Sequence, residues 1–354
     1  MRVGLVYQGL KAPEEAWSGI PWGLATGLRE AGHEAVFLRA SSPRLIERGR
    51  EIAAARIRAA EALDPEFVRL RSAFLARAVR GAGELDALVQ FGTGFLLPPH
   101  PRIATFEDMT VKQAIASDPA YDVQPRALEK WIARQRASYE GARACLTLSQ
   151  WAADSIVSEY GVDPAKVRAV GAGRNLDPQP APREWSPPRF LFVGFDWGRK
   201  NGDAVLRAFR RLREEVPEAQ LSLVGHHPPL SQAGVSGHGP LALGDPEQRR
   251  RLEREFETAT CFVMPSKIEP YGIVYREAAA AGIPSIGTTA GGAPDAVGAN
   301  GVCVDPGDDD ALFREMRKYS DPRVAQAAGA AAAENRDETT WRVVAERSLE
   351  ALGL

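Results

Sequence analysis

The 354-residue sequence has few cysteines and no long apolar run. Its three cysteines, Cys145, Cys261 and Cys303, are far apart, and each lies in or beside an apolar segment. This spacing suggests neither a metal knuckle nor a disulfide framework. No segment reaches the roughly 18 consecutive apolar residues of a membrane-spanning helix, and the opening residues MRVGLVYQ lack the apolar region of an export signal. We therefore expect a protein of the reducing cytoplasm.

The sequence also lacks an excess of either charge. Its 44 basic and 46 acidic side chains leave a formal net charge of -2, whereas proteins that bind mainly nucleic acid need a concentrated basic surface. We therefore expect no nucleic-acid partner. The region from Arg44 to Arg80, which carries nine arginines, is a local exception. The favoured interpretation is a solvated helix face, because acidic residues lie among the arginines; the alternative is a basic amphipathic helix in peripheral contact with the inner membrane.

Short β-branched apolar runs alternate with long amphipathic segments in two successive series, a pattern typical of βαβ units and parallel sheets. The first series predicts strands near Val3–Tyr7, Glu34–Leu38, Ala87–Phe91, Arg102–Phe106, Ala144–Leu148 and Val167–Val170. The second predicts strands near Phe190–Val193, Gln220–Val224, Cys261–Met264, Ser285–Gly287 and Gly301–Val304.

A proline-rich stretch separates the two series and indicates a linker between two domains. We expect an α/β protein with an N-terminal Rossmann-like domain over 1–172, a linker over 173–188 and a C-terminal Rossmann-like domain over 189–336. The amphipathic segment 337–354 is expected to form a helix that packs back on the first domain.

The first segment with chemical potential is FLFVGFDWGRKNG, which contains Gly194, Arg199, Lys200 and Gly202. Ligands of open α/β sheets bind at the carboxyl ends of strands. Glycines and two cations between a strand and a helix predict a phosphate site, because amides and cationic groups can converge there on an anion. We expect Lys200 to be an exposed loop cation; the alternative for the whole segment is a polar surface loop.

A second segment, CFVMPSKIEPYGIVYREAAAAGIP, carries Glu269 in a loop and Glu277 in a helix that begins near Val274. The amides before this helix form another anion site, and the two carboxylates can bind sugar and ribose hydroxyls. Alternatively, Glu277 complements the helix dipole and Glu269 is a solvated loop residue. A third segment, GTTAGGAPDAV, provides two glycines that allow close approach of a ligand.

These segments resemble the retaining glycosyltransferases of the GT-B fold, specifically glycosyltransferase family 4. The hallmark is a Glu-x7-Glu block, matched here by Pro265, Ser266, Glu269, Pro270, Tyr271, Gly272, Glu277, Ala278, Gly282 and Pro284. The resemblance implies two Rossmann-like domains that face an interdomain cleft. It also implies a nucleotide-diphosphate sugar as co-substrate. We expect no other cofactor, and no metal because Arg199, Lys200 and the amides before the Val274 helix supply the positive charge that a metal would bring.

The resemblance also assigns roles to individual residues. Arg199 and Lys200 would contact the donor diphosphate, Glu269 the transferred sugar and Glu277 the ribose. Gly19 would approach the diphosphate from the first domain, and the base would lie near Leu243 and Gly244. The other implied donor-binding residues are Gly194, Pro270, Tyr271, Gly272, Ile273 and Val274.

Two acidic features need separate interpretation. Many family members have a Thr-x-His-Asp pattern where this sequence reads Thr105, Phe106, Glu107 and Asp108, so we expect either Glu107 or Asp108 to face the sugar or acceptor in place of the histidine. The Asp-x-Asp at Asp308 and Asp310 resembles a metal-binding pair. We interpret it instead as a helix cap followed by acidic residues that complement the helix dipole.

The predicted function is retaining transfer of a sugar from a nucleotide-diphosphate donor to an acceptor hydroxyl. The rival from another class is a catalytically silent sugar-nucleotide-binding subunit that supports a partner protein. A sugar-nucleotide epimerase is disfavoured by the Glu-x7-Glu block, and a hydrolase that uses Glu269 and Glu277 would leave Arg199 and Lys200 without a role. The acceptor is not identified by any motif.

Overall fold

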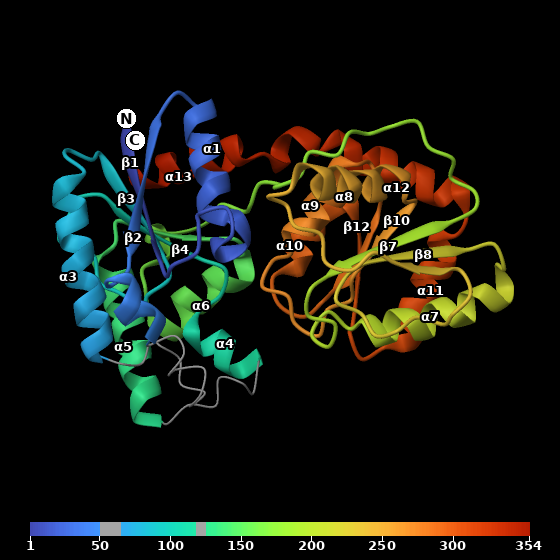
Figure 1. The fold of residues 1–354 in the computed structure, drawn as a ribbon, viewed down its shortest axis with the longest axis horizontal. Coiled ribbons are helices and arrows are strands. Elements are labelled where there is room, and N and C mark those ends of the chain that lie inside the picture. The colour runs from blue at the N-terminus through green and yellow to red at the C-terminus, as the bar shows by residue number, and fades with distance from the viewer. Residues whose placement is uncertain (50–64, 118–124) are drawn as a thin grey trace. The chain divides into compact units, whose positions relative to one another are not determined.

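The computed structural model describes residues 1–49, 65–117 and 125–354. The chain divides into two compact units: Met1–Ala172 with Trp341–Leu354, and Gly173–Thr340 (Figure 1). Each unit contains a six-stranded sheet, and every strand pair within these sheets is parallel. The α/β prediction is therefore confirmed for both halves of the chain.

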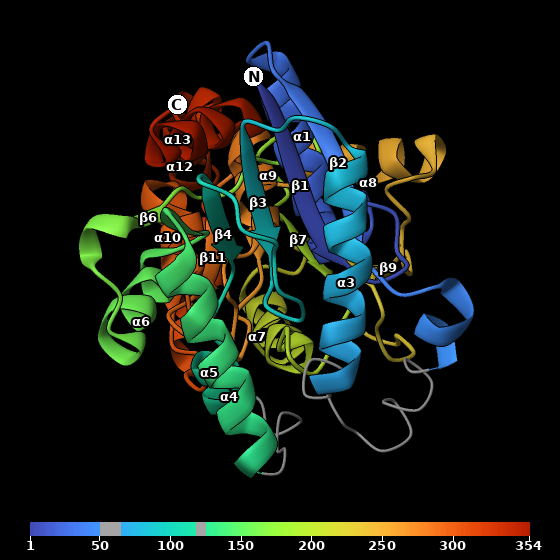
Figure 2. The same ribbon diagram turned by 90° about the vertical axis from the view of Figure 1, so that its left-hand side faces the viewer.

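The sheet of the first unit has the strand order β2-β1-β3-β4-β5-β6. Its strands are β1 (Arg2–Gln8), β2 (Glu34–Ala40), β3 (Ala87–Phe91), β4 (Ile103–Glu107), β5 (Ala144–Thr147) and β6 (Val167–Ala169). The helices of this unit are α1 (Ile20–Glu30), α3 (Pro65–Gly81), α4 (Val111–Ser117), α5 (Pro125–Gly141), α6 (Gln150–Tyr160) and α13 (Trp341–Leu352). Figure 2 shows α3 and α5 in front of the strands in that view.

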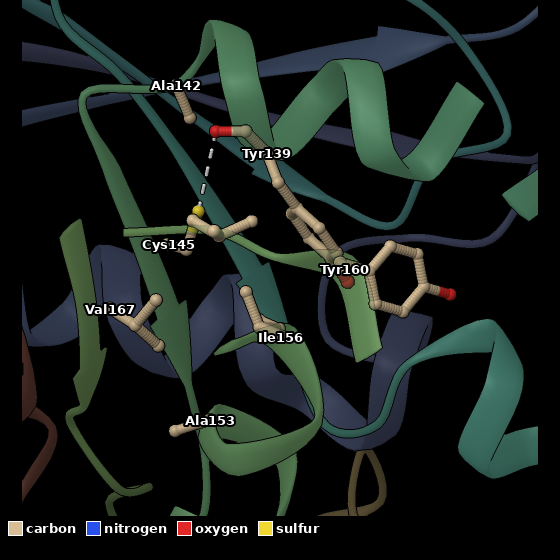
Figure 3. Packing of buried hydrophobic residues seen from close by; sticks show 8 residues of the cluster. Tyr139, Ala142, Cys145, Ala153, Ile156, Tyr160 and Val167 are labelled. Atoms are coloured by element: carbon tan, nitrogen blue, oxygen red, sulfur yellow. Dashed lines mark hydrogen bonds between the residues drawn. The ribbon is translucent and has the colours of Figure 1, made fainter. Parts of the chain in front are cut away.

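One core cluster of the first unit joins α5 and α6 to strands β5 and β6 (Figure 3). The rings of Tyr139 and Tyr160 pack edge to face with centroids 5.2 Å apart, a favoured arrangement for aromatic pairs. The Cys145 thiol donates to the Tyr139 carbonyl at 3.7 Å. Burial raises the pKa of Cys145 to about 11, so this thiol is a packing residue rather than a nucleophile.

Helix α13 packs against α1 within the first unit. The close approach depends on two glycines of α1: a Cβ at Gly23 would overlap the Trp341 indole, and a Cβ at Gly27 would overlap the Trp341 carbonyl. Trp341 is only 6% exposed. The C-terminal helix thus begins at Trp341, whereas the short turn Arg336–Thr339 before it belongs to the second unit.

The sheet of the second unit has the strand order β12-β11-β10-β7-β8-β9. Its strands are β7 (Arg189–Gly194), β8 (Gln220–Gly225), β9 (Val235–Gly237), β10 (Cys261–Val263), β11 (Ser285–Thr288) and β12 (Gly301–Val304). Its helices are α7 (Gly202–Glu215), α8 (Pro246–Thr258), α9 (Ile273–Ala280), α10 (Ala293–Val297), α11 (Asp309–Tyr319) and α12 (Pro322–Glu334). The short edge strand β9 has no counterpart in the prediction.

The segment 173–188, expected as a linker, packs as part of the second unit. The Arg183 guanidinium donates to the carbonyls of Phe256, Ala259 and Ala281, and burial lowers the pKa of Arg183 to about 10. These bonds satisfy carbonyls at the ends of α8 and α9, where intrahelical donors run out. The proline-rich composition therefore marks an irregular but anchored segment.

The solvated face expected over Arg44–Arg80 is wrong at Arg71, although several arginines of this region are exposed. The Arg71 side chain is 1% exposed and forms an ion pair with Glu47, with Nε donating to Oε1 at 2.8 Å. Ser42 donates to the other carboxylate oxygen through its backbone amide and its hydroxyl. Part of the region, residues 50–64, lies outside the described residues, and peripheral membrane contact stays a prediction.

Candidate functional site

The predicted phosphate loop follows β7 and is fixed by Asn201, the residue before α7. Asn201 adopts a left-handed conformation (φ 62°), and its side-chain amide donates to the carbonyls of Pro265 and Pro306. The loop therefore lies against the segments that follow β10 and β12. Gly194 lies under it, because a Cβ there would be 2.9 Å from the Lys200 Cγ. This arrangement directs Lys200 toward the β10 side of the sheet.

Lys200 and Glu269, 69 residues apart, form a largely buried ion pair at this edge. Arg199 Nη1 lies 3.7 Å from the same carboxylate oxygen, Glu269 Oε2, and the Ser266 hydroxyl donates to it at 3.1 Å. Burial lowers the pKa of Lys200, and the Glu269 charge opposes that shift. The expectation that Lys200 is exposed is wrong: its side chain is 13% exposed.

All these contacts fall on Oε2 of Glu269, and Oε1 has no hydrogen bond within the described part of the chain. One carboxylate oxygen therefore fixes the orientation of the side chain, while the other can accept a hydrogen bond from a ligand hydroxyl. Glu269 is only 5% exposed, and its backbone pairs with Gly291 and its neighbours: Gly292 N donates to Glu269 O at 2.9 Å. The second and third predicted segments thus meet.

The helix that follows, α9, begins at Ile273, one residue before the predicted start. Gly272 occupies its N-cap in a left-handed conformation (φ 86°), and no side chain caps its first amides. Pro270 and Tyr271 complete the turn. The Tyr275 hydroxyl donates to the Met264 carbonyl at 2.6 Å and ties the first turn to the end of β10. Uncapped helical amides beside cationic side chains are the general arrangement for binding an anion.

Glu277 lies about one turn after the start of α9, and its side chain is buried, with only 6% exposure. Its carboxylate accepts a hydrogen bond from the Leu176 amide at 3.2 Å. Burial raises the pKa of Glu277 to about 7, although the amides of Leu176 and Asn175 and the charge of Arg249 lower it. The interpretation of Glu277 as a simple dipole partner is therefore incomplete, because the carboxylate also holds the segment around Leu176.

The two residues of the predicted base site, Leu243 and Gly244, are less closely connected to the other site residues. Leu243 is 41% exposed, and it lies with Gly244 in the loop between β9 and α8. Among the residues that the structure describes, no hydrogen bond joins these two residues to the Lys200–Glu269 pair. Their assignment stays a prediction.

In the first unit, Gly19 lies at the N-cap of α1 with φ 81°. It follows Trp17 and Ser18, which also have positive φ values of 51° and 55°. Three successive left-handed residues form a tight turn at the start of the helix, and such backbone conformations cluster at ligand-binding sites. The side chain of Trp17 packs over Gly92 in the loop after β3.

Glu107 lies at the end of β4, but its side chain is enclosed in the first unit with 3% exposure. Burial raises the pKa of Glu107 well above its usual range, the Asp108 charge raises it further, and Gln135 lowers it. Its Oε1 atom has no hydrogen-bond partner in the described structure. Glu107 is thus about as buried as Glu269, whereas Asp108 is only half-buried, and which of Glu107 and Asp108 faces the sugar or acceptor stays a prediction.

The Asp-x-Asp segment has the structure expected of a helix cap. Asp308 is the N-cap of α11 and accepts from the Ala311 amide at 2.8 Å. Asp309 and Asp310 pair with Arg207 and Arg211 of α7. Within 1–49, 65–117 and 125–354, no group of three or more His, Cys, Asp or Glu side chains is arranged to hold a metal ion.

Several residues of this arrangement were missed by the sequence reasoning. Asn201 anchors the phosphate loop, Tyr275 fixes the α9 turn, and Leu176 binds Glu277. An asparagine directly before a helical glycine signals a left-handed N-cap residue and could have identified Asn201. No local pattern indicates Leu176, because its partner is 101 residues away.

Residues 187–321 match the family model of glycosyl transferases group 1. The chain is 35% identical over 172 residues to a GDP-mannose-dependent alpha-(1-6)-phosphatidylinositol monomannoside mannosyltransferase of Mycolicibacterium smegmatis, covering 44% of each chain. It is 32% identical over 232 residues to a D-inositol 3-phosphate glycosyltransferase of Streptomyces avermitilis, covering 56% of this chain and 49% of the relative. The chain thus spans about half the length of the curated relatives it matches.

The crystal structure of WaaG, a glycosyltransferase involved in lipopolysaccharide biosynthesis, superposes with a TM-score of 0.69 at 14% identity and covers 99% of both chains. This likeness shows the fold. The chain has the GT-B fold, residues 187–321 are similar to the group 1 glycosyltransferase domain, and the resemblance to GT-B glycosyltransferases is confirmed. Among the described helices, none is both long and apolar enough to cross a membrane.

Proposed function

We propose that the protein transfers a hexose from a nucleotide-diphosphate donor to an acceptor hydroxyl, with retention at the anomeric carbon. The Lys200–Glu269 pair beside the uncapped start of α9 carries this proposal. It brings together cations and amides for a diphosphate and a carboxylate oxygen for a sugar hydroxyl. The group 1 domain match and the named relatives support a nucleotide-sugar donor.

Stabilisation of the leaving group provides most of the catalysis in this proposal. Cleavage of the bond between the sugar and the diphosphate places additional negative charge on the diphosphate oxygens. Lys200, Arg199 and the amides of Ile273 and Val274 would stabilise this charge, because they are held in place before the reaction. Glu269 would orient the sugar through Oε1 while Lys200 and Ser266 hold Oε2.

Retention requires no protein nucleophile if the acceptor attacks on the face that the leaving group departs from. A donor phosphate oxygen can then accept the proton of the acceptor hydroxyl. The same cations supply the positive charge that a divalent ion would bring, so we propose that the reaction is metal-independent and needs no cofactor. We further propose a cytoplasmic location, in keeping with the three unpaired cysteines.

Lys200→Gln tests the proposal most directly. Glutamine can keep a hydrogen bond to Glu269 but lacks the positive charge, so we expect sugar transfer to fall at least 100-fold, as for loss of one preorganised transition-state donor. Lys267→Gln removes an exposed cation from the adjoining loop after β10, whose backbone amide donates to the Arg199 carbonyl, and is the matched control. Equal activity of Lys200→Gln and Lys267→Gln would remove Lys200 from the site.

The finer parts of the proposal have their own measurements. Activity should persist in excess chelator, and NMR of fresh product should show the anomeric configuration of the donor sugar. Loss of activity that magnesium or manganese restores would overturn metal independence, and an inverted anomer would overturn retention. Tight donor binding without hydrolysis or transfer across a broad acceptor panel would identify a silent subunit instead.

A further inference from the structure

A concave site with an excess of positive charge lies in the first unit, between residues 165–170 and the last turns of α13. Its cavity has a volume of about 380 Å³, and Figure 2 labels the two elements, β6 and α13, that border it. The charged residues that line it are Lys166, Arg168, Arg347 and Glu350. Three cations therefore share one cavity with a single carboxylate.

The Lys166 ammonium is held in place by backbone carbonyls rather than by an acid. Its Nζ donates to the carbonyls of Glu140 at 3.0 Å and Ala142 at 3.1 Å, at the end of α5. Among the described residues, no carboxylate lies within ion-pair distance of it. An ammonium has three donors, so one N–H remains for a ligand, and the positive charge is not neutralised.

Arg168, which is exposed, is likewise held by backbone carbonyls rather than by an acid. Its Nη1 donates to the carbonyls of Pro164 at 3.4 Å and Val167 at 2.8 Å, which restricts the guanidinium. Its Nε and Nη2 atoms make no hydrogen bond, and no acid pairs with it, in the part of the chain that the structure describes. The guanidinium fork thus retains donors in the geometry that suits carboxylate or phosphate oxygens.

Other surface arginines of this protein do have acidic partners. Arg207 binds Asp309 through two nitrogen atoms, at 2.7 and 3.0 Å, and Arg317 lies 2.6 Å from Glu215. Two neighbouring cations without such partners in one concavity produce a local positive potential that attracts anions. We propose that this cavity binds the phosphate group of a ligand, with Lys166 and Arg168 as the principal contacts.

The cavity walls come from two sequence-distant parts of the first unit, so a bound phosphate group would also hold α13 in place. This site consists of first-unit residues, whereas the proposed diphosphate contacts Lys200 and Arg199 belong to the second. The proposal therefore does not depend on the donor assignment, and the two can fail separately.

The test measures binding of inorganic phosphate by calorimetry in a Lys200→Gln background, which weakens the proposed donor site. We expect Lys166→Gln/Arg168→Gln to lower phosphate affinity at least tenfold, because two charged donors are lost. Arg126→Gln/Lys130→Gln removes two exposed cations of α5 and should change affinity less than twofold. Unfolding midpoints without phosphate check that all variants fold.

A second arm separates a soluble ligand from a lipid headgroup. Vesicles of phosphatidylglycerol in phosphatidylcholine present the same phosphate chemistry at a surface, with pure phosphatidylcholine as the control. Binding of phosphate or of the charged vesicles that is lost in Lys166→Gln/Arg168→Gln supports the site and identifies the source. Failure of both probes to bind, or equal binding by Lys166→Gln/Arg168→Gln and Arg126→Gln/Lys130→Gln, overturns it.

Discussion

Replacement of Glu277 by glutamine should stabilise the second unit above neutral pH while it weakens donor binding. The Glu277 carboxyl is 6% exposed, and no Lys, Arg or His side chain in the described residues lies within 4.0 Å of it. Burial without a paired cation disfavours the charged form. The amides of Leu176 and Asn175 compensate for part of this cost, yet the pKa of Glu277 still rises from 4.5 to about 7.

The direction of the pH effect follows from proton binding. Between about pH 4.5 and pH 7 the folded protein holds a proton on Glu277 that the unfolded chain has lost, so the free energy of unfolding falls as pH rises through this window. A pKa difference of about 2.5 corresponds to about 3 kcal/mol. The stabilisation by the protonated Glu277 carboxyl is complete below the pKa of the unfolded chain, 4.5, and is lost as the pH rises above the pKa of the folded protein, about 7. The glutamine side chain does not titrate in this range, so the free energy of unfolding of Glu277→Gln should lack the fall with pH that Glu277 causes.

Urea unfolding at pH 5, 6, 7 and 8 measures the effect directly. The free energy of unfolding of Glu277→Gln minus that of the wild type should grow by about 2.5 kcal/mol between pH 5 and pH 8, because part of the effect has already been lost at pH 5. Glu334→Gln, at an exposed position in α12, is the control and should follow the wild-type profile. Parallel profiles for Glu277→Gln and the wild type would refute the argument.

The same variant tests the proposed ribose contact. A carboxylate can accept hydrogen bonds from two ribose hydroxyls through its oxygens, whereas an amide presents one acceptor oxygen and a donor nitrogen. Nucleoside diphosphate affinity at pH 8 should therefore fall in Glu277→Gln even though the protein is more stable. Unchanged affinity would leave Glu277 with only its structural contact to Leu176.

Two further predictions concern the first unit. Gly27→Ala should lower the free energy of unfolding by about 1–3 kcal/mol, because its Cβ would overlap the Trp341 backbone; Gly81→Ala, with open space around it in α3, should be neutral or slightly stabilising in the same urea titration. Glu107→Gln should remove a loss of stability with rising pH, because burial raises the pKa of this carboxyl, and should keep sugar transfer near the wild-type rate. Asp108→Asn should reduce transfer, and the opposite ranking of these two variants in an activity assay would contradict the structure.

Much of the fold could be predicted because parallel strands are buried on both faces and form short apolar runs. The predicted Ala87–Phe91 agrees with β3 at both ends, and all five of its residues are buried. Strand β9 was missed because Val235–Gly237 has only three residues, none of them buried, and ends in glycine. Its pairing with β8 is a tertiary effect that leaves no periodic pattern in the sequence.

The site was predictable where one short segment contains both the residues and their backbone geometry. The block around Glu269 and Gly272 has this property, since the strand end, turn and helix start follow one another directly. The burial of the site side chains could not be predicted from a single segment in this way. Lys200 appeared as an exposed loop cation, but its partner Glu269 comes from another strand-end loop, and only the pairing of β7 with β10 brings the two loops together.

Glu107, Glu269 and Glu277, the three buried glutamates among the predicted site residues, differ in how the protein compensates their charge, and this difference bears on their roles. Glu269 pairs with Lys200 and Arg199, whereas Glu277 accepts a backbone hydrogen bond and has no paired cation among the described residues. Glu107 has a raised pKa and one oxygen without a partner in the described residues. Burial and the neighbouring Asp108 charge both disfavour the charged form of such a carboxyl. The half-buried neighbour Asp108 is therefore the better candidate for acceptor chemistry that needs an anion at the end of β4.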